Sequence, residues 1–253
     1  MDYIQGRFPI IQKENLAKDV YSLWIRCPEL AGRAEPGQFV HIRVEGFPLR
    51  RPISLCEIEP DLIRLVFQVR GEGTRALGAL REGDNLDLIG PLGKGFTLLP
   101  PSRKAVLIGG GIGAPPMLEL ARRYGADASV ILGFRTAAAV ILEEDFARTG
   151  AQVILCTDDG SAGQKGFVTS ALESQLEGVD LICACGPLPM LKGIAALAQE
   201  RGIPCQVSLE ERMGCGVGAC LVCACRTVRD GQEIFSHVCK DGPVFDAETV
   251  VFE

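Results

Sequence analysis

Histidine, basic charge and long apolar runs are all scarce in this 253-residue chain. Only His41 and His237 are present, so the sequence offers no obvious histidine-based acid–base apparatus. The net charge is −6, which argues against a nucleic-acid binder that relies on a basic stripe. The longest apolar runs, such as residues 105–108 and 130–134, have the length of a strand and fall far short of a membrane span. We therefore expect neither nucleic-acid binding nor a membrane span.

A secretory signal is also missing from the start of the sequence. The segment MDYIQGRFPI lacks the charged start and the apolar core of a signal peptide. Eleven cysteines in a chain without such a leader indicate a reducing compartment, where thiols bind metals or pack in the core. Their odd number also argues against a fully paired disulfide framework. We therefore expect a cytoplasmic protein.

Apolar residues, by contrast, are plentiful enough for a sizeable core. They make up 47% of the chain and charged residues make up 23%, a balance typical of folded globular proteins. The length suits two or three domains. In the first hundred residues, short segments rich in β-branched and aromatic residues are separated by Gly and Pro, which predicts a small antiparallel barrel. The predicted strands include 19–27, 39–44 and 62–69, and one short helix is predicted at 74–80.

Pro100-Pro101 marks a linker, after which predicted strands and helices alternate. Strands are predicted at 104–108, 129–134, 152–156 and 180–185, and helices at 116–124, 142–149, 168–176 and 188–201. Because these strands are continuously apolar, they indicate a parallel sheet covered on both faces. The last fifty residues are Gly- and Cys-rich with little periodicity. The sequence therefore predicts three domains, over residues 1–100, 101–206 and 207–253.

Four cysteines near the C-terminus carry the strongest chemical signal. Their spacing is C-x4-C-x2-C followed by fifteen residues and a last C, and the residues are Cys215, Cys220, Cys223 and Cys239. This spacing is typical of plant-type [2Fe–2S] clusters, which carry one electron at a time. Glycines interleave the first ligands, and they let backbone N–H groups approach the sulfur atoms. We therefore predict a [2Fe–2S] site with these four ligands.

Other interpretations of the same cysteines are weaker. A structural zinc site usually shows two C-x2-C pairs, whereas this segment has one C-x2-C and one C-x4-C. Four unliganded core thiols are a third alternative. Cys225 lies two residues from a ligand but outside the pattern, and we interpret it as a packing residue.

Two short motifs in the first hundred residues suggest a flavin site. Arg51-Pro52-Ile53-Ser54 places a guanidinium and a hydroxyl on one strand, and the planar fork of Arg suits a phosphate. Gly71-Glu72-Gly73-Thr74 precedes the predicted helix, where free N–H groups can bind a pyrophosphate. Alone, the first motif is weak because surface Arg and Ser are common, and an ordinary helix cap by Thr74 is the alternative for the second. With an electron-transfer cluster in the same chain, FAD is the favoured interpretation.

The second region contains a glycine loop in the context that a dinucleotide requires, between a strand and a helix. Its glycines are Gly109, Gly110, Gly111 and Gly113, and Pro116 stands in place of the last glycine of the usual pattern. No acidic residue ends the next strand, so Arg135 leaves NADP open. Cys185-Gly186-Pro187 ends a later strand, where parallel sheets bind ligands. Cys185 either lines a nicotinamide pocket or only packs.

The three signals combine into one expectation. Nicotinamide exchanges a hydride, a [2Fe–2S] cluster exchanges single electrons, and a flavin can exchange either. A chain holding all three would connect two-electron with one-electron chemistry. The predicted fold class is accordingly multidomain β and α/β, with a FAD-binding barrel, an NAD-binding α/β domain and a small cluster domain.

The barrel, R-P-I-S, glycine loop and C-G-P turn, in this order, resemble the ferredoxin–NADP⁺ reductase superfamily. The C-terminal runs S-L-E-E-R-M-G-C-G-V-G-A-C (208–220) and C-K-D-G-P-V-F (239–245) more specifically resemble the electron-transfer subunits of type B dihydroorotate dehydrogenases. The resemblance covers essentially the whole chain. It implies FAD contacts at Arg51–Ser54, at Gly73 and Thr74, and on the strand at Phe67, Gln68 and Val69. Many relatives carry a basic or aromatic pair where Phe67-Gln68 stands.

The resemblance also implies a partner and a pathway. Electrons would come from an FMN-containing catalytic subunit that oxidises dihydroorotate, and would pass through the cluster and FAD to NAD⁺ in pyrimidine (UMP) biosynthesis. Relatives assemble as heterotetramers with two copies of each subunit. A flavin and iron–sulfur subunit of a sulfhydrogenase or of a ferredoxin–NADP transhydrogenase is the main alternative, and a zinc-stapled binding module is a distant one.

Overall fold

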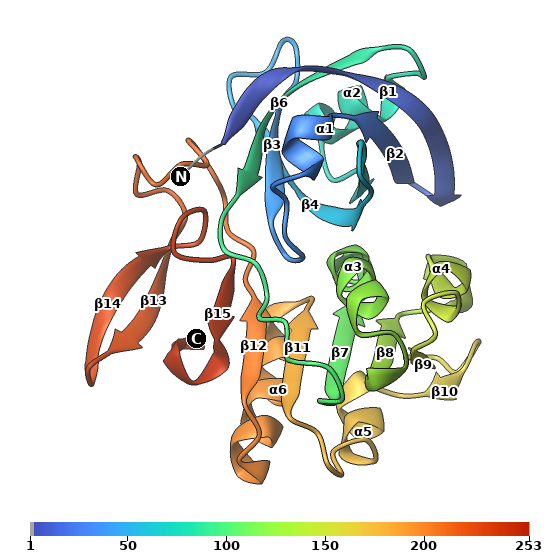
Figure 1. Ribbon diagram of the computed structural model, residues 1–253, viewed down its shortest axis with the longest axis vertical. Helices are drawn as coiled ribbons and strands as arrows, with labels where there is room; N and C mark the ends of the chain where they lie inside the picture. The colour runs from blue at the N-terminus through green and yellow to red at the C-terminus, as the bar shows by residue number, and fades with distance from the viewer. Residues whose placement is uncertain (1–2, 253) are drawn as a thin grey trace.

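A computed structural model of the chain describes residues 3–252 and divides into three regions (Figure 1). A closed barrel occupies the upper part of the view, and a sheet flanked by helices lies below it. A two-stranded hairpin and its connecting loops, coloured orange to red, lie beside both. This arrangement confirms the predicted fold class, with an antiparallel barrel followed by a largely parallel α/β sheet and a small C-terminal region.

The barrel consists of six antiparallel strands in the order β1-β2-β5-β4-β3-β6. Their bounds are β1 Ile4–Ala17, β2 Val20–Arg26, β3 Phe39–Arg43, β4 Arg51–Ile58, β5 Leu62–Gln68 and β6 Asn85–Leu92. Two short helices accompany them, α1 at Pro28–Ala31 and α2 at Glu72–Ala79. Alternate apolar residues fill the interior, among them Leu23, Ile42, Leu65 and Leu88, each fully buried.

The sheet has seven strands in the order β10-β9-β8-β7-β11-β12-β15. Their bounds are β7 Ala105–Gly110, β8 Ala128–Phe134, β9 Gln152–Thr157, β10 Gln164–Lys165, β11 Leu181–Cys185, β12 Cys205–Ser208 and β15 Val244–Asp246. All pairs are parallel except β12 with β15. The predicted parallel sheet is therefore present, extended by one antiparallel edge strand from the C-terminal region.

Helices cover both faces of this sheet, as continuously apolar strands require. The bounds are α3 Pro115–Tyr124, α4 Glu143–Ala147, α5 Val168–Glu173 and α6 Leu188–Arg201. Leu107 and Val130 point toward α3 and α4, whereas Ile108 and Ile131 point toward α5 and α6. In Figure 1, α3 lies between the barrel and the sheet, so it contacts both.

The C-terminal region is more ordered than its sequence suggests. Strands β13 (Ala224–Arg229) and β14 (Gln232–His237) form a regular antiparallel hairpin where little periodicity is visible. The four predicted cluster cysteines flank it, three before β13 and one after β14. Among residues 3–252, no helix is long and apolar enough to cross a membrane.

Candidate functional site

The loop that carries Cys215 and Cys220 wraps tightly around sulfur atoms. Backbone N–H groups of Val217, Ala219 and Cys220 point at the Cys215 Sγ, at N···S distances of 3.5, 3.2 and 3.4 Å. The Gly218 N–H donates to the Cys239 Sγ at 3.1 Å. Gly216 and Gly218 adopt φ of +75° and +77°, which glycine tolerates and other residues resist. The loop thus aims its amides inward, as a bound anionic cluster requires.

The four predicted ligand cysteines interact as two pairs. The Cys215 thiol interacts with the Cys220 side chain, and the Cys239 thiol interacts with the Cys223 side chain. Two pairs match the binuclear cluster predicted from the spacing, in which each iron takes two thiolates.

The pKa values of the thiols differ because their surroundings differ. Burial would raise the pKa of Cys215, but the three amides and the Cys220 thiol together lower it to about 6. Burial and the neighbouring Cys223 raise the pKa of Cys239 to about 12, against the opposing effect of the Gly218 N–H. A metal ion deprotonates such a thiol outright when it binds. Of these two thiols, Cys215 is therefore the better prepared to be a thiolate before iron binds.

His41 joins this loop to the barrel. Its ring lies against Gly216, where an added Cβ would sit 2.5 Å from Nδ1. The side chain is fully buried, and within residues 3–252 neither ring nitrogen has a hydrogen-bond partner. Burial lowers the pKa of His41 to about 4, although the backbone of Cys215 and of Arg50 opposes the shift. The ring is therefore uncharged and fills the space between β3 and the cluster loop.

A second contact holds the far end of the cluster region on the barrel. The Lys94 N–H donates to the Gly242 carbonyl at 2.6 Å, and Lys94 pairs with Pro243 in a parallel bridge. Gly93, with φ of +75°, packs so closely on Pro243 that a side chain would not fit. The His237 carbonyl accepts hydrogen bonds from the backbone N–H groups of Lys240 and Asp241 in the turn that carries Cys239.

The two predicted flavin motifs meet in space. β4 begins at Arg51 and α2 begins at Glu72, and the Arg51 guanidinium lies directly on Gly73. A Cβ at position 73 would occupy the place of this guanidinium, so Arg51 would have to move away. A fork of N–H donors thus lies beside the first turn of a helix, whose own N–H groups have no intrahelical acceptors. These residues fit a pyrophosphate such as that of FAD.

The helix beside the flavin motif needs one correction. α2 starts two residues earlier than predicted, so Thr74 is not its N-cap residue; the Thr74 Oγ1 accepts from the Gly71 N–H at 3.1 Å instead. Phe67 is only 2% exposed and packs inside the barrel near Tyr21, whereas Gln68 and Val69 are half-buried at the end of β5. The contacts of Pro52, Ile53, Ser54, Phe67, Gln68 and Val69 with FAD stay predictions.

The glycine loop and the C-G-P turn also meet. β7 and β11 are parallel neighbours with Gly109 opposite Cys185, so their C-terminal ends share one edge of the sheet. A Cβ on Gly113 would collide with the Cys185 carbonyl, and one on Gly110 would lie 3.1 Å from the Pro187 ring. Gly111 adopts φ of +54° at the sharp turn into α3. The predicted nucleotide segments therefore form one continuous edge.

A cavity of about 390 Å³ opens beside this edge, between the C-G-P turn and the β13–β14 hairpin. Its lining includes Gly186, Pro187, Glu210, Cys225 and Phe235. Cys185 lies next to it, and burial raises its pKa to about 12, with opposing and reinforcing effects from Ser208 and Glu210. Cys185 is therefore a neutral thiol, and whether it lines a nicotinamide pocket or only packs stays open.

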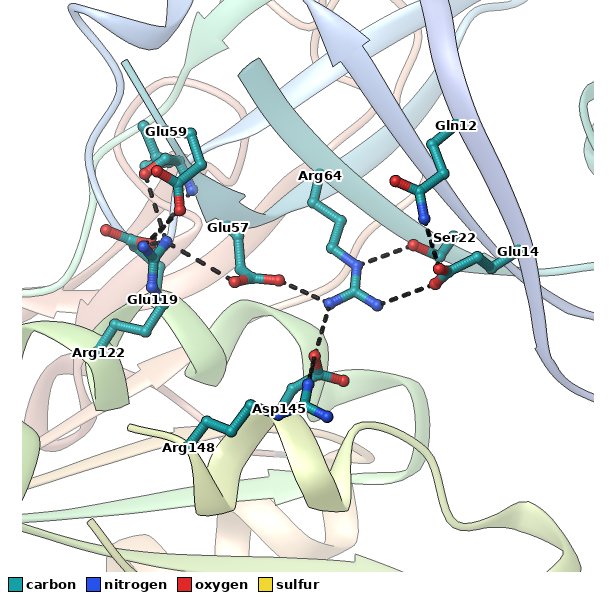
Figure 2. Close-up of polar contacts among 11 residues, drawn as sticks. Gln12, Glu14, Ser22, Glu57, Glu59, Arg64, Glu119, Arg122, Asp145 and Arg148 are labelled. Carbon is teal, nitrogen blue, oxygen red and sulfur yellow. Dashed lines mark hydrogen bonds and ion pairs between the residues drawn. The ribbon is translucent and has the colours of Figure 1, made fainter. Parts of the chain in front are cut away.

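One group of residues had no signal in the sequence. A network of ion pairs (Figure 2) joins the barrel to the α/β region, and its members are Glu57 and Arg64 from the barrel and Glu119, Arg122 and Asp145 from the α/β region. Its members come from strands and helices far apart in the chain, and none belongs to a recognisable motif. Only the tertiary fold brings them together.

The cluster region matches a known family. Residues 210–251 match the iron–sulfur cluster binding domain of dihydroorotate dehydrogenase B. The chain is 41% identical over 98% of its length to "Dihydroorotate dehydrogenase B (NAD(+)), electron transfer subunit" of Shouchella clausii, covering 98% of that protein. It is 43% identical over 97% of its length to the protein of the same name from Geobacillus thermodenitrificans, covering 98% of it.

The chain belongs to the family of dihydroorotate dehydrogenase B electron-transfer subunits. The predicted family is thereby confirmed, together with the predicted role as an electron-transferring oxidoreductase subunit that uses FAD, [2Fe–2S] and NAD. The name of the family implies a catalytic partner subunit. The individual residues that contact FAD, NAD and the cluster stay predictions.

Solved structures agree with the fold. The structure reported as "Insights into flavin-based electron bifurcation via the NADH-dependent reduced ferredoxin-NADP oxidoreductase structure" superposes with a TM-score of 0.85 and 33% identity, over 97% of this chain and 90% of that one. The Amycolatopsis cytochrome P450 reductase GcoB superposes with a TM-score of 0.65 and 24% identity, over 79% of this chain and 67% of that one. The second likeness concerns the barrel and sheet fold alone.

Proposed function

We propose that this subunit passes electrons from an FMN-containing dihydroorotate dehydrogenase catalytic subunit, through its own [2Fe–2S] cluster and FAD, to NAD⁺ in pyrimidine (UMP) biosynthesis. The observation that carries the proposal is the packing of the cluster loop on the strands that bear the flavin motif. Gly216 lies on His41 of β3, and β3 pairs with β4, where Arg51 and Ser54 lie. Cluster and flavin would thus share one rigid support.

The roles of this chain's residues follow from that arrangement. Cys215, Cys220, Cys223 and Cys239 would hold the cluster, and Arg51 with the first turn of α2 would hold the FAD pyrophosphate. The glycine loop and the C-G-P turn would present NAD from the facing edge of the sheet. Bound FAD supplies the ability to exchange either one or two electrons.

The assembly and the location are also part of the proposal. We infer a heterotetramer with two copies of each subunit, and a division of this chain into residues 1–100, 101–206 and 207–253. A cytoplasmic location is supported by eleven cysteines that are all free thiols in the structure.

Co-expression with the candidate catalytic subunit tests the proposed function. The purified complex should be yellow-brown and should reduce NAD⁺ when dihydroorotate is added. Size-exclusion chromatography with light scattering should give the mass of two copies of each subunit. Equal NAD⁺ reduction by the catalytic subunit alone would contradict the proposal.

A second candidate function is favoured by one observation, the likeness to the NADH-dependent reduced ferredoxin–NADP oxidoreductase at a TM-score of 0.85. A subunit of such a transhydrogenase would share the architecture and differ in its partner. The same co-expression separates the two candidates. Failure of dihydroorotate to reduce NAD⁺ through the complex, combined with reduction of the chain's flavin by NADH, would favour the transhydrogenase partner.

A further inference from the structure

A network of ion pairs crosses the junction between the barrel and the α/β region (Figure 2). On the barrel side its centre is Arg64 of β5, which is only 4% exposed. The Arg64 Nη1 contacts Glu57 at 2.6 Å within the barrel and Asp145 of α4 at 3.2 Å across the junction. The Arg64 Nε donates to the Ser22 hydroxyl at 2.8 Å. A buried cation is thus held by partners from both regions.

On the α/β side the centre is Glu119 of α3, which is 1% exposed. Its Oε2 accepts from the backbone N–H of Ile58, at the end of β4, at 3.2 Å. Arg122 and Arg123 of the same helix balance its charge at 2.9 and 2.7 Å. Arg122 also reaches across to the carboxylate of Glu59. The junction is therefore defined by directional contacts as well as by apolar packing.

The network joins β4 and β5 of the barrel to α3 and α4, and β4 and α3 carry predicted cofactor motifs. β4 begins with Arg51-Pro52-Ile53-Ser54 and ends with Glu57 and Ile58. α3 begins directly after the glycine loop and carries Glu119 and Arg122 in its second and third turns. A strand and a helix are both stiff. Contacts that hold the C-terminal end of β4 against α3 therefore fix the angle between Arg51–Ser54 and the glycine loop.

That angle matters for hydride transfer, which needs the donor carbon and the acceptor atom in near contact. A misplacement of about 1 Å by a change far from the chemistry can slow such a step by about a hundredfold. Buried charges resist sliding because any displacement leaves one of them unpaired. The apolar part of the junction, such as Cys56 and Val66 against α3, has no such directional preference.

We propose that the cross-junction contacts of Arg122 and Asp145 make them positioning residues for hydride transfer between NAD and FAD. This inference rests on the proposed function of the chain. Neither residue belongs to the predicted cofactor motifs or to the cluster loop. Their effect would be on the alignment of two cofactors that other residues bind.

The test is a double variant, Arg122→Gln with Asp145→Asn, in the full chain with its cofactors bound. It removes the ion pairs that cross the junction but leaves Arg64 with Glu57, and Glu119 with Arg123, so each buried charge keeps a partner in its own region. Flavin reduction by NADH, followed by stopped-flow absorbance, should slow by about ten- to a hundredfold at saturating NADH. The NADH concentration for half-maximal rate, the flavin content and the cluster spectrum should stay unchanged.

Two comparisons make the result specific. Glu144, the residue before Asp145 on α4, forms an exposed ion pair with Arg148. Glu144→Gln removes this pair and should leave the rate of flavin reduction at the wild-type value. Arg122→Lys with Asp145→Glu keeps both charges and should give a rate closer to wild type than to the double variant. A readout independent of activity is amide hydrogen exchange at Ile58, which should accelerate in the double variant because the Glu119 contact loosens.

The possible failures are distinguishable. A double variant with full flavin that NADH reduces at the wild-type rate would overturn this inference alone. A rate that falls only in proportion to lost flavin, or equally in the charge-retaining variant, would also overturn it, because the residues would then act through folding. If NADH does not reduce the flavin of the wild-type chain, the proposed function itself fails, and this inference fails with it.

Discussion

The barrel meets its two neighbours through contacts of opposite kinds. At the cluster junction, glycines pack directly on ring side chains with no space for a side chain of their own, as at Gly216 on His41 and Gly93 on Pro243. At the α/β junction, long charged side chains such as Arg64 and Arg122 reach across instead. Close packing on glycine brings the cluster loop near the barrel, whereas a network of ion pairs sets the angle between the barrel and the α/β region. The contrast suggests that the cluster needs proximity to the flavin and the nicotinamide needs orientation.

The strongest way to break the cluster junction is to remove a ligand. Cys220→Ser should abolish dihydroorotate-dependent NAD⁺ reduction by the complex, because the cluster loses one of its four thiolates. Reduction of a dye by NADH should persist in part, because that reaction needs only NADH and FAD. Visible absorbance and electron paramagnetic resonance would show the loss of the cluster. Unchanged transfer from dihydroorotate to NAD⁺ would place the cluster off the path.

The next largest effect is expected at Arg51, in the predicted flavin motif at the start of β4. Arg51→Ala should weaken FAD binding by about ten- to a hundredfold, since a hydrogen bond to a charged group contributes about 1.5–3 kcal/mol. Flavin retained after gel filtration measures this directly. Arg75→Ala is the matched control on α2, because its exposed side chain pairs only weakly with Glu72. Full flavin content in Arg51→Ala would refute the assigned contact.

The tightness of the cluster junction can be tested with two glycines of nearly equal φ. Gly216 has φ of +75° and Gly231, in the hairpin turn, has φ of +76°. Alanine at either site should lower the free energy of unfolding by about 1 kcal/mol from backbone strain. Only Gly216→Ala should also alter the cluster's paramagnetic resonance spectrum, because its Cβ would displace His41, whereas Gly231 has open space. Identical spectra in the two variants would show that the packing on His41 does not matter.

The smallest effect is expected at Cys225, which lies near the ligands without being one. It sits on β13 opposite Ser236, and burial raises its pKa to about 11, with smaller effects from nearby acidic groups and Cys223. Cys225→Ser should keep the full iron content and change stability by less than about 1 kcal/mol. Iron analysis checks this, and loss of half the iron would make Cys225 a ligand.

The sequence predicts well where one physical signal dominates. The apolar strands of the α/β sheet and the cysteine spacing are of this kind, and their predicted segments match β7, β8, β9 and β11 closely. β1 was missed because its fourteen residues mix polar and apolar side chains as it pairs with both β2 and β6. The β13–β14 hairpin was also missed, although Asp230-Gly231 is a strong hairpin-turn signal.

Contacts between distant segments were beyond the sequence. In the sequence, only the resemblance to a family connects Arg51–Ser54 with Gly73-Thr74. The structure shows that Arg51 contacts Gly73. The pairing of Arg64 with Asp145 has no local pattern, because charged residues at these positions look like ordinary surface. His41 likewise gave no sign that it packs on the cluster loop. Burial and partners of polar residues arise from the tertiary fold and not from local periodicity.

Electron transfer between FAD and the cluster within this chain is tested most directly by an anaerobic titration of the purified chain with NADH. Flavin absorbance and the cluster's paramagnetic resonance are followed together. NADH should reduce both the flavin and the cluster within the one chain. A flavin that bleaches while the cluster stays oxidised, although dithionite reduces that same cluster, would show that electrons do not pass between the two.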